Sequence, residues 1–132
     1  MEGRGKMWWI GFSMSALVVL FLFMDAGMKL AAVRPVLEAG QQLGFAGEAM
    51  ARKLGAILLI CTLLYVWPRT SVLGAILVTA FLGGAVATHV RMGSPLFTHV
   101  LFGVDLGVLL WAGLVLREPR LRSLLADSLR IL

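Results

Sequence analysis

The chain has 132 residues, of which 60% are hydrophobic and 14% are charged, and its formal net charge is +5. Soluble globular domains carry about 25% charged residues, and the mean hydropathy here is +0.93. A water-soluble monomer is therefore excluded, and the expected solvent is lipid. The single cysteine, Cys61, excludes an internal disulfide or dithiol pair. The sequence has no basic run with interleaved aromatic residues, so we expect no nucleic-acid partner.

Four apolar runs predict four membrane-spanning helices, because about 20 apolar residues cross the hydrocarbon core as a helix. The predicted spans cover residues 7–28, 47–67, 71–90 and 96–116. The first run is longer than the apolar region of a secretory signal and no Ala-x-Ala site follows it, so we interpret it as an uncleaved span. We expect one membrane domain over residues 1–132, with an all-α fold: an antiparallel four-helix bundle.

The segments between the spans carry polar and turn-forming residues. Residues 36–43 are predicted to form a short interfacial helix. The apolar run 54–67 is too short to cross the membrane at 1.5 Å per residue, so we expect its helix to begin near Gly47. Gly93-Ser94-Pro95 is predicted to be a turn, and residues 120–132 a short basic amphipathic tail.

The lysines and arginines predict the orientation. With four spans, both termini lie on one side of the membrane. That side carries seven lysines and arginines: Arg4, Lys6, Arg69, Arg117, Arg120, Arg122 and Arg130. The other side carries five: Lys29, Arg34, Arg52, Lys53 and Arg91. Because cytoplasmic segments are enriched in these residues, we expect both termini to be cytoplasmic. The tryptophans, at positions 8, 9, 67 and 111, all fall in the cytoplasmic half.

Several polar residues are predicted to gather near the outer boundary. At 1.5 Å per residue, Asp25, His89 and His99 all lie roughly 26–27 Å from the inner ends of three different spans. Lys29 follows Asp25 by four residues, so the two side chains share a helix face and can pair. Arg91 closely follows His89. We therefore predict an outward-facing ligand pocket with Asp25, Lys29, His89 and His99 at its mouth. Arg91 is a further candidate residue of this pocket, although the spacing of two points it and His89 to different sides of the helix end.

Asp105 is predicted to form the floor of that pocket. It lies about 17 Å from the inner end of its span, near the midplane, where an ionisable residue is costly and usually faces the bundle interior with a partner. Simpler interpretations stay open: a structural hydrogen bond for Asp105, a solvated Asp25–Lys29 ion pair, and histidines that only contact the interface. A metal site on His89, His99 and a carboxylate is chemically feasible, but we expect no metal, and no catalytic residue is identifiable.

Small residues in the third span predict close helix packing. We expect Gly83, Gly84 and Ala87 to pack against other helices of the same chain, or to leave space for water above Asp105. The pattern from Gly103 to Gly107 is a G-x-x-x-G motif, which fits intramolecular packing and a homo-oligomer equally well.

Five stretches resemble the DoxX-like family. They are residues 61–70, 73–77 and 82–91, the Asp25-x-x-x-Lys29 step, and His99-Val-Leu-Phe-Gly103. The resemblance implies a four-helix integral protein of the bacterial inner (plasma) membrane. Many relatives carry a glutamate near the position of Leu58, which is apolar here. Their roles are diverse: a subunit of a thiosulfate:quinone oxidoreductase, a component of a mycobacterial oxidant-defence complex, and a chaperone for nicotinic receptor assembly.

Three function classes follow from these observations. The expected one is a non-enzymatic module that binds a small lipophilic ligand or a partner protein through the polar pocket. The alternative is a membrane subunit of a quinone-linked oxidoreductase that places a quinone near a redox partner. No cofactor is evident from the sequence, since it has no haem or flavin motif and no paired cysteines, so the partner would carry the electrons. The third is a transporter or proton path that uses Asp105.

Overall fold

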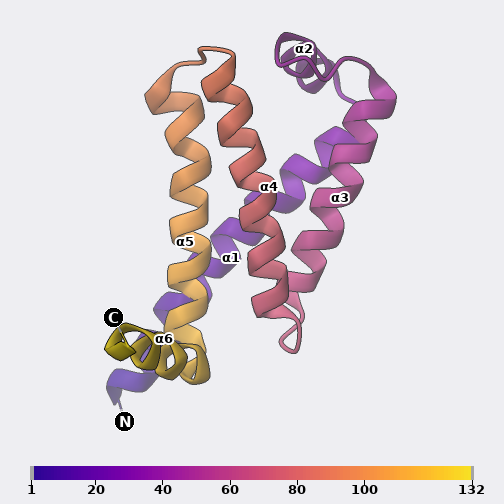
Figure 1. Ribbon diagram of the computed structural model, residues 1–132. Coiled ribbons are helices and arrows are strands. Elements are labelled where there is room, and N and C mark those ends of the chain that lie inside the picture. Colours follow the sequence, from indigo (N-terminus) through magenta and orange to yellow (C-terminus); the bar gives the residue numbers. More distant parts are fainter. Residues whose placement is uncertain (1, 132) are drawn as a thin grey trace.

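The computed structural model describes residues 2–131, which form helices joined by short turns (Figure 1). The helices are α1 (Glu2–Leu30), α2 (Arg34–Gln42), α3 (Glu48–Val66), α4 (Ser71–Arg91), α5 (Leu101–Arg117) and α6 (Pro119–Ile131). A single π-helical turn, η1 (Leu96–Val100), leads directly into α5. The predicted all-α fold class is confirmed.

Four stretches of helix are long and apolar enough to cross a membrane: Gly3–Leu30, Glu48–Val66, Ser71–Arg91 and Leu96–Arg117. The chain is therefore a multi-pass membrane protein whose long helices contact lipid. The first helix begins before residue 7, the predicted start of its span, because hydropathy marks the apolar run and not the helix. The second span's helix begins at Glu48, next to the predicted Gly47.

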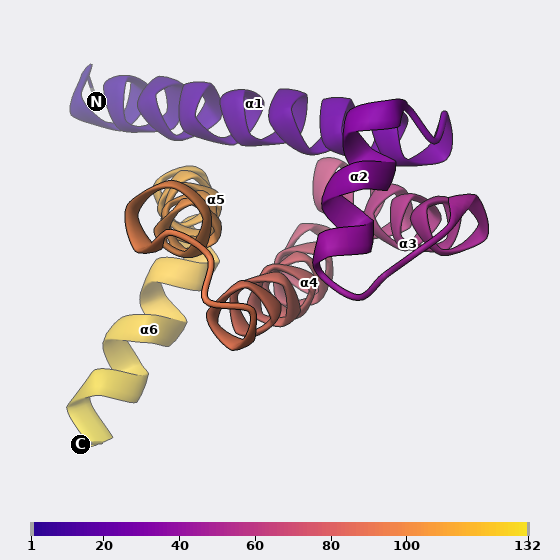
Figure 2. The same cartoon turned by 90° about the horizontal axis from the view of Figure 1, so that it is seen from above.

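The short helix α2 starts two residues before the predicted residue 36. Pro35 occupies its first turn, where the missing N–H of proline costs no intrahelical hydrogen bond. The C-terminal tail forms the helix α6, which places Leu121 against the core and leaves Leu124, Leu125 and Leu129 exposed. Viewed from above, α6 runs away from the long helices, and α2 lies across the opposite end of the molecule (Figure 2).

The long helices make four neighbouring pairs: α1 packs against α3 and α5, and α4 also packs against α3 and α5. The chain thus has two distinguishable ends. We call one of them the termini end. It carries the start of α1, the helix α6 and the turn 67–70 between α3 and α4 (Figure 1). The other, the α2 end, carries α2 and the turn 92–95. Figure 1 shows α3 and α4 meeting at the termini end and diverging towards the α2 end.

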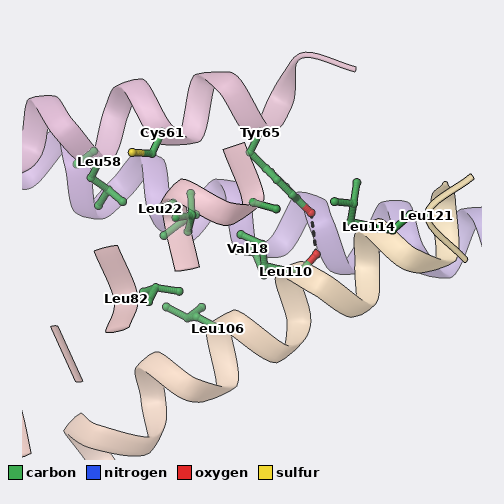
Figure 3. Close-up of a cluster of buried hydrophobic side chains, with 13 residues drawn as sticks. Val18, Leu22, Leu58, Cys61, Tyr65, Leu82, Leu106, Leu110, Leu114 and Leu121 are labelled. Atoms are coloured by element: carbon green, nitrogen blue, oxygen red, sulfur yellow. Dashed lines mark hydrogen bonds between the residues drawn. The ribbon is translucent and has the colours of Figure 1, made fainter. Parts of the chain in front are cut away.

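The buried apolar side chains form one cluster along the contact between these helices (Figure 3). Its largest fully buried member is Tyr65 of α3. The phenol donates a hydrogen bond to the Leu110 carbonyl of α5 at 3.0 Å and lies 2.8 Å from the Ser15 hydroxyl of α1. Because the phenol proton is used at Leu110, the Ser15 hydroxyl donates to the phenol oxygen. One side chain therefore ties three helices together.

Glycines let backbones approach each other near Tyr65. A Cβ at Gly74 of α4 would collide with the Tyr65 backbone, and a Cβ at Gly113 of α5 would lie 2.5 Å from the Ser15 hydroxyl oxygen. At Gly11 of α1, a Cβ would lie 2.7 Å from the Gly113 carbonyl oxygen. Only glycine permits these contacts, so these residues set the helix spacing at the termini end.

Gly83, Gly84 and Ala87 do not perform the packing role expected from the sequence. All three are exposed, and a Cβ at either glycine would meet nothing within 4 Å. The close-packing prediction is therefore corrected. Hydropathy and residue size identify a small residue in a span, but its rotation about the helix axis decides whether it meets a neighbour. Here, the missing side chains of Gly83 and Gly84 leave space in two neighbouring hollows beside α4.

Candidate functional site

A cavity of about 470 Å³ lies between the diverging helices at the α2 end. Its walls are mostly apolar. They include Phe21 of α1, Leu54 of α3, Phe81 of α4, and Phe102 and Leu106 of α5. Four of the six predicted site residues also line it: Asp25, Lys29, His89 and His99. The cavity thus combines an aromatic and aliphatic interior with charged and imidazole groups from three helical segments.

Asp25 and Lys29 form an ion pair along one face of α1. The Lys29 ammonium donates to Oδ2 of Asp25 at 2.5 Å, and the two side chains are only 20% and 26% exposed. By contrast, Arg34 and Glu38 of α2 are 91% and 67% exposed and lie 3.7 Å apart. Water screens the Asp25–Lys29 pair less than the Arg34–Glu38 pair, so the attraction between Asp25 and Lys29 is stronger. The pair places polar groups in the cavity wall without adding net charge.

The two histidines face each other across the α4–η1 turn. Their ring centres are 5.3 Å apart and their planes are tilted by 53°. Nδ1 of His89 lies 3.0 Å from the Ser94 hydroxyl, and Nδ1 of His99 lies 2.7 Å from the Thr98 hydroxyl. These local contacts hold both rings in place and leave each Nε2 for a further hydrogen bond.

The backbone of η1 brings His99 to this position. Pro95 is extended and ends the turn after α4, and η1 then makes a π-helical turn. Such turns change the rotation of the following helix and are frequent at functional sites. The sequence identified the two histidines and their common height, but a π-helical turn has no simple sequence signal.

The segment after α2 closes one side of the cavity. Leu43 and Phe45 line it from this segment. Gly44 between them has φ +86° and Gly47 has φ +98°, which favour glycine. Sequence analysis assigned these residues to a connection and missed their place in the site. It also missed the phenylalanines, since apolar residues in a span carry no signal that separates a cavity wall from a lipid-facing surface.

Asp105 and Arg91 do not line the cavity. Asp105 is exposed on α5, and two residues separate it from Gly103, which does line it. Asp105 lies about 60° and 100° around the helix from Phe102 and Leu106, which also line the cavity, so it sits beside the lining face and not on it. The predicted position at the pocket floor is therefore corrected: counting residues gives depth but not direction. Arg91 is exposed, and its guanidinium lies 3.5 Å from a Cβ built at Gly44.

Gly83 and Gly84 of α4 contribute to two neighbouring hollows, which share Leu82, Val86 and Gly103 in their linings. Gly84 lines the cavity. Gly83 lines a second, apolar groove of about 540 Å³ between α4 and α5, together with Gly103, Gly107 and Trp111. Adjacent residues on a helix differ by about 100° in direction, so one glycine widens the cavity and the other widens the groove.

Metal ligation was also weighed from the sequence. Across residues 2–131, no group of three or more histidine, cysteine, aspartate and glutamate side chains is arranged to hold a metal ion. The carboxylate that lines the cavity together with the two histidines is that of Asp25, and it forms an ion pair with Lys29. The arrangement suits hydrogen bonding to a ligand with a polar group at one end.

The sequence model of the DoxX-like family matches residues 13–113, which is more than half of the chain. The chain belongs to the DoxX-like family. The matched region runs from the middle of α1 well into α5 and includes Asp25, Lys29, His89 and His99 of the cavity. No curated protein and no solved structure matches this DoxX-like protein.

Proposed function

We propose that this DoxX-like protein is a membrane module that binds one small amphiphilic molecule in the cavity at the α2 end and has no catalytic activity of its own. The observation that carries the proposal is the composition of the cavity: phenylalanine and leucine walls with Asp25, Lys29, His89 and His99 among them. Its volume of about 470 Å³ is within the range of about 300–1,000 Å³ typical of small-molecule sites.

The polar residues favour a ligand head group without net charge. Asp25 and Lys29 neutralise each other, so a charged head group would displace an existing pair. The two imidazoles supply hydrogen bonds through Nε2, as donors or acceptors. The phenylalanines accommodate an apolar body or chain. A hydroxyl- or carbonyl-bearing lipophilic molecule fits this pattern.

A quinone is one member of that class, which supports the second candidate function. The carbonyl oxygens of a quinone accept hydrogen bonds, which an imidazole N–H of His89 or His99 can donate, and its flat apolar ring suits the phenylalanine and leucine walls. In this candidate the protein is the membrane subunit of a quinone-linked oxidoreductase, and a partner protein supplies the electron carrier. A bound quinone together with a co-purifying redox protein would favour it, and a redox-inactive lipid would favour the first candidate.

The location and orientation belong to the same proposal. We propose the bacterial inner membrane, with the termini end in the cytoplasm and the cavity towards the outer leaflet, because seven of the twelve lysines and arginines lie at the termini end. Reporter fusions placed in the turn 92–95 and after residue 132 test it. A cytoplasmic signal from the turn would reverse the orientation.

Binding is tested with two neighbouring glycines. Gly84→Phe fills the cavity, whereas Gly83→Phe fills the groove between α4 and α5, and neither new side chain meets an atom within 4 Å at its Cβ. We expect mass spectrometry of the purified wild type and of Gly83→Phe to detect the same co-purifying amphiphile, and decylubiquinone to raise the melting temperature of both if the head group is a quinone. Gly84→Phe should lose both effects. Equal retention of the amphiphile by all three proteins would refute the cavity as the site.

A further inference from the structure

An exposed carboxyl group lies in the middle of the last span. Asp105 is exposed, and it belongs to the 22-residue span Leu96–Arg117, in which a stretch of 18 residues has a mean hydropathy of 2.0. None of the ion pairs formed within residues 2–131 includes it. Its Cα lies about 13 Å along the helix from Leu96 and farther from Arg117. An aspartate side chain is too short to reach the head groups from there, so lipid alone is an unfavourable neighbour.

The residues around Asp105 form a continuous stripe on α5. Leu101, Asp105, Val108 and Ala112 follow one another at spacings of four, three and four residues, and each is exposed or half-buried. Helix residues at these spacings share one face. The same pattern forms the seam between paired helices, where a single polar residue fixes the register. We call these four residues the α5 stripe.

We propose that the α5 stripe is the contact surface for a second copy of this chain, with the two Asp105 carboxyl groups hydrogen-bonded across a two-fold axis. Copies insert into the membrane in one orientation, so an axis along the membrane normal sets each residue opposite its own counterpart at the same depth. A carboxyl group suits this position because its oxygens can both donate and accept a hydrogen bond, so two facing carboxyl groups can serve as each other's partner in the membrane.

The distribution of cations also favours a second copy. The lysines and arginines of the chain lie towards the ends of the spans, so no cation of a symmetric partner lies at the depth of Asp105. The nearest alternative is Lys53 of α3, which is exposed. However, α3 and α5 are not neighbours in the fold. A Lys53–Asp105 contact would therefore join two different surfaces and produce an open chain or ring of copies.

The contact is tested by cross-linking the full-length chain in liposomes. In a Cys61→Ala background, Ala112→Cys places a thiol on the α5 stripe, and Gly107→Cys places one about 140° farther around α5, in the groove between α4 and α5 that Val108 also lines. We expect an oxidant or a short bifunctional maleimide to produce a covalent dimer with Ala112→Cys and not with Gly107→Cys. Dimer formation with Gly107→Cys alone would overturn the proposed surface.

The role of Asp105 is tested by counting copies with single-molecule photobleaching at a series of protein-to-lipid ratios. We expect Asp105→Asn to dimerise as the wild type does, because an amide is also both donor and acceptor. Asp105→Leu should need about a tenfold higher protein-to-lipid ratio, the scale of one interhelical polar contact in lipid. Monomeric wild type at every ratio would overturn the proposal. Loss of dimers in Asp105→Asn and Lys53→Gln alike would replace the symmetric pair with an ion pair.

Discussion

The termini end and the α2 end of the bundle are built differently from the same kinds of residue. At the termini end, glycines bring backbones together, and Tyr65 connects α1, α3 and α5 by hydrogen bonds. At the α2 end, Gly55 of α3 still lies close to Lys29 and Leu30 of α1, but α3 and α4 diverge, and Gly84 faces a cavity that also contains two histidines and an ion pair. The comparison teaches that a glycine in a span can close a contact or keep a space open, according to its direction.

The difference suggests a division of labour along the bundle. A firmly packed termini end fixes the positions of the four long helices, and the α2 end is then free to carry polar residues that contribute little to packing. Functional sites in general rest on rigid elements that hold their side chains in position. Substitutions at the termini end should therefore act on stability, and substitutions at the α2 end should act chiefly on binding.

The largest effect is expected from Gly74→Ala. The added methyl group would collide with the backbone of Tyr65, which cannot move away without separating α3 from α4. Overpacking of this kind costs about 3 kcal/mol or more when backbone must shift. We expect a strongly lowered melting temperature in detergent or a failure to purify. Gly83→Ala, the same change in the same helix with open space around it, is the control and should melt like the wild type.

Tyr65→Phe should have a smaller effect on the same end. The ring remains buried, but the Leu110 carbonyl and the Ser15 hydroxyl both lose their partner. Hydrogen bonds between membrane helices contribute about 0.6 kcal/mol on average and up to about 1.7 kcal/mol. We expect a free energy of unfolding lower by about 1 kcal/mol, measured by steric trapping. A Ser15→Ala, Tyr65→Phe double variant that is no less stable than Tyr65→Phe would show that the two hydroxyls act as one unit.

The sequence predicted the helices well because long apolar runs have few alternatives in a bilayer: every backbone polar group must be satisfied internally, and a helix does so within one segment. It also predicted that Asp25, His89 and His99 lie at similar heights, since helix rise converts residue number into depth, and that Lys29 shares a helix face with Asp25. These four do line one cavity.

The sequence did not predict which way each side chain points around its helix axis. The mean apolar character of these spans is nearly uniform around the helix, because both the core and the lipid accept leucine and valine. Periodicity, which separates core from surface in soluble helices, is therefore weak. That is why Asp105 and Gly83 were assigned to the interior, although both are exposed.

The smallest effects on stability should come from breaking ion pairs. These effects distinguish the half-buried Asp25–Lys29 pair from the exposed Arg34–Glu38 pair. Lys29→Met leaves the half-buried Asp25 without its cation and should lower the free energy of unfolding by about 1 kcal/mol. Arg34→Met removes a pair that is mostly exposed and should leave the melting temperature unchanged. Equal effects of the two substitutions would show that the position of Asp25 and Lys29 in the cavity has no energetic consequence.

A double variant then separates stability from binding. In Asp25→Leu, Lys29→Met no charge is left without a partner, so stability should return to about that of the wild type, because replacing a whole ion pair with apolar groups of similar size is often neutral. If the pair orients a ligand head group, the co-purifying amphiphile should still be lost. Recovery of both stability and the amphiphile would mean that the ion pair has no part in binding and that the two histidines hold the head group alone.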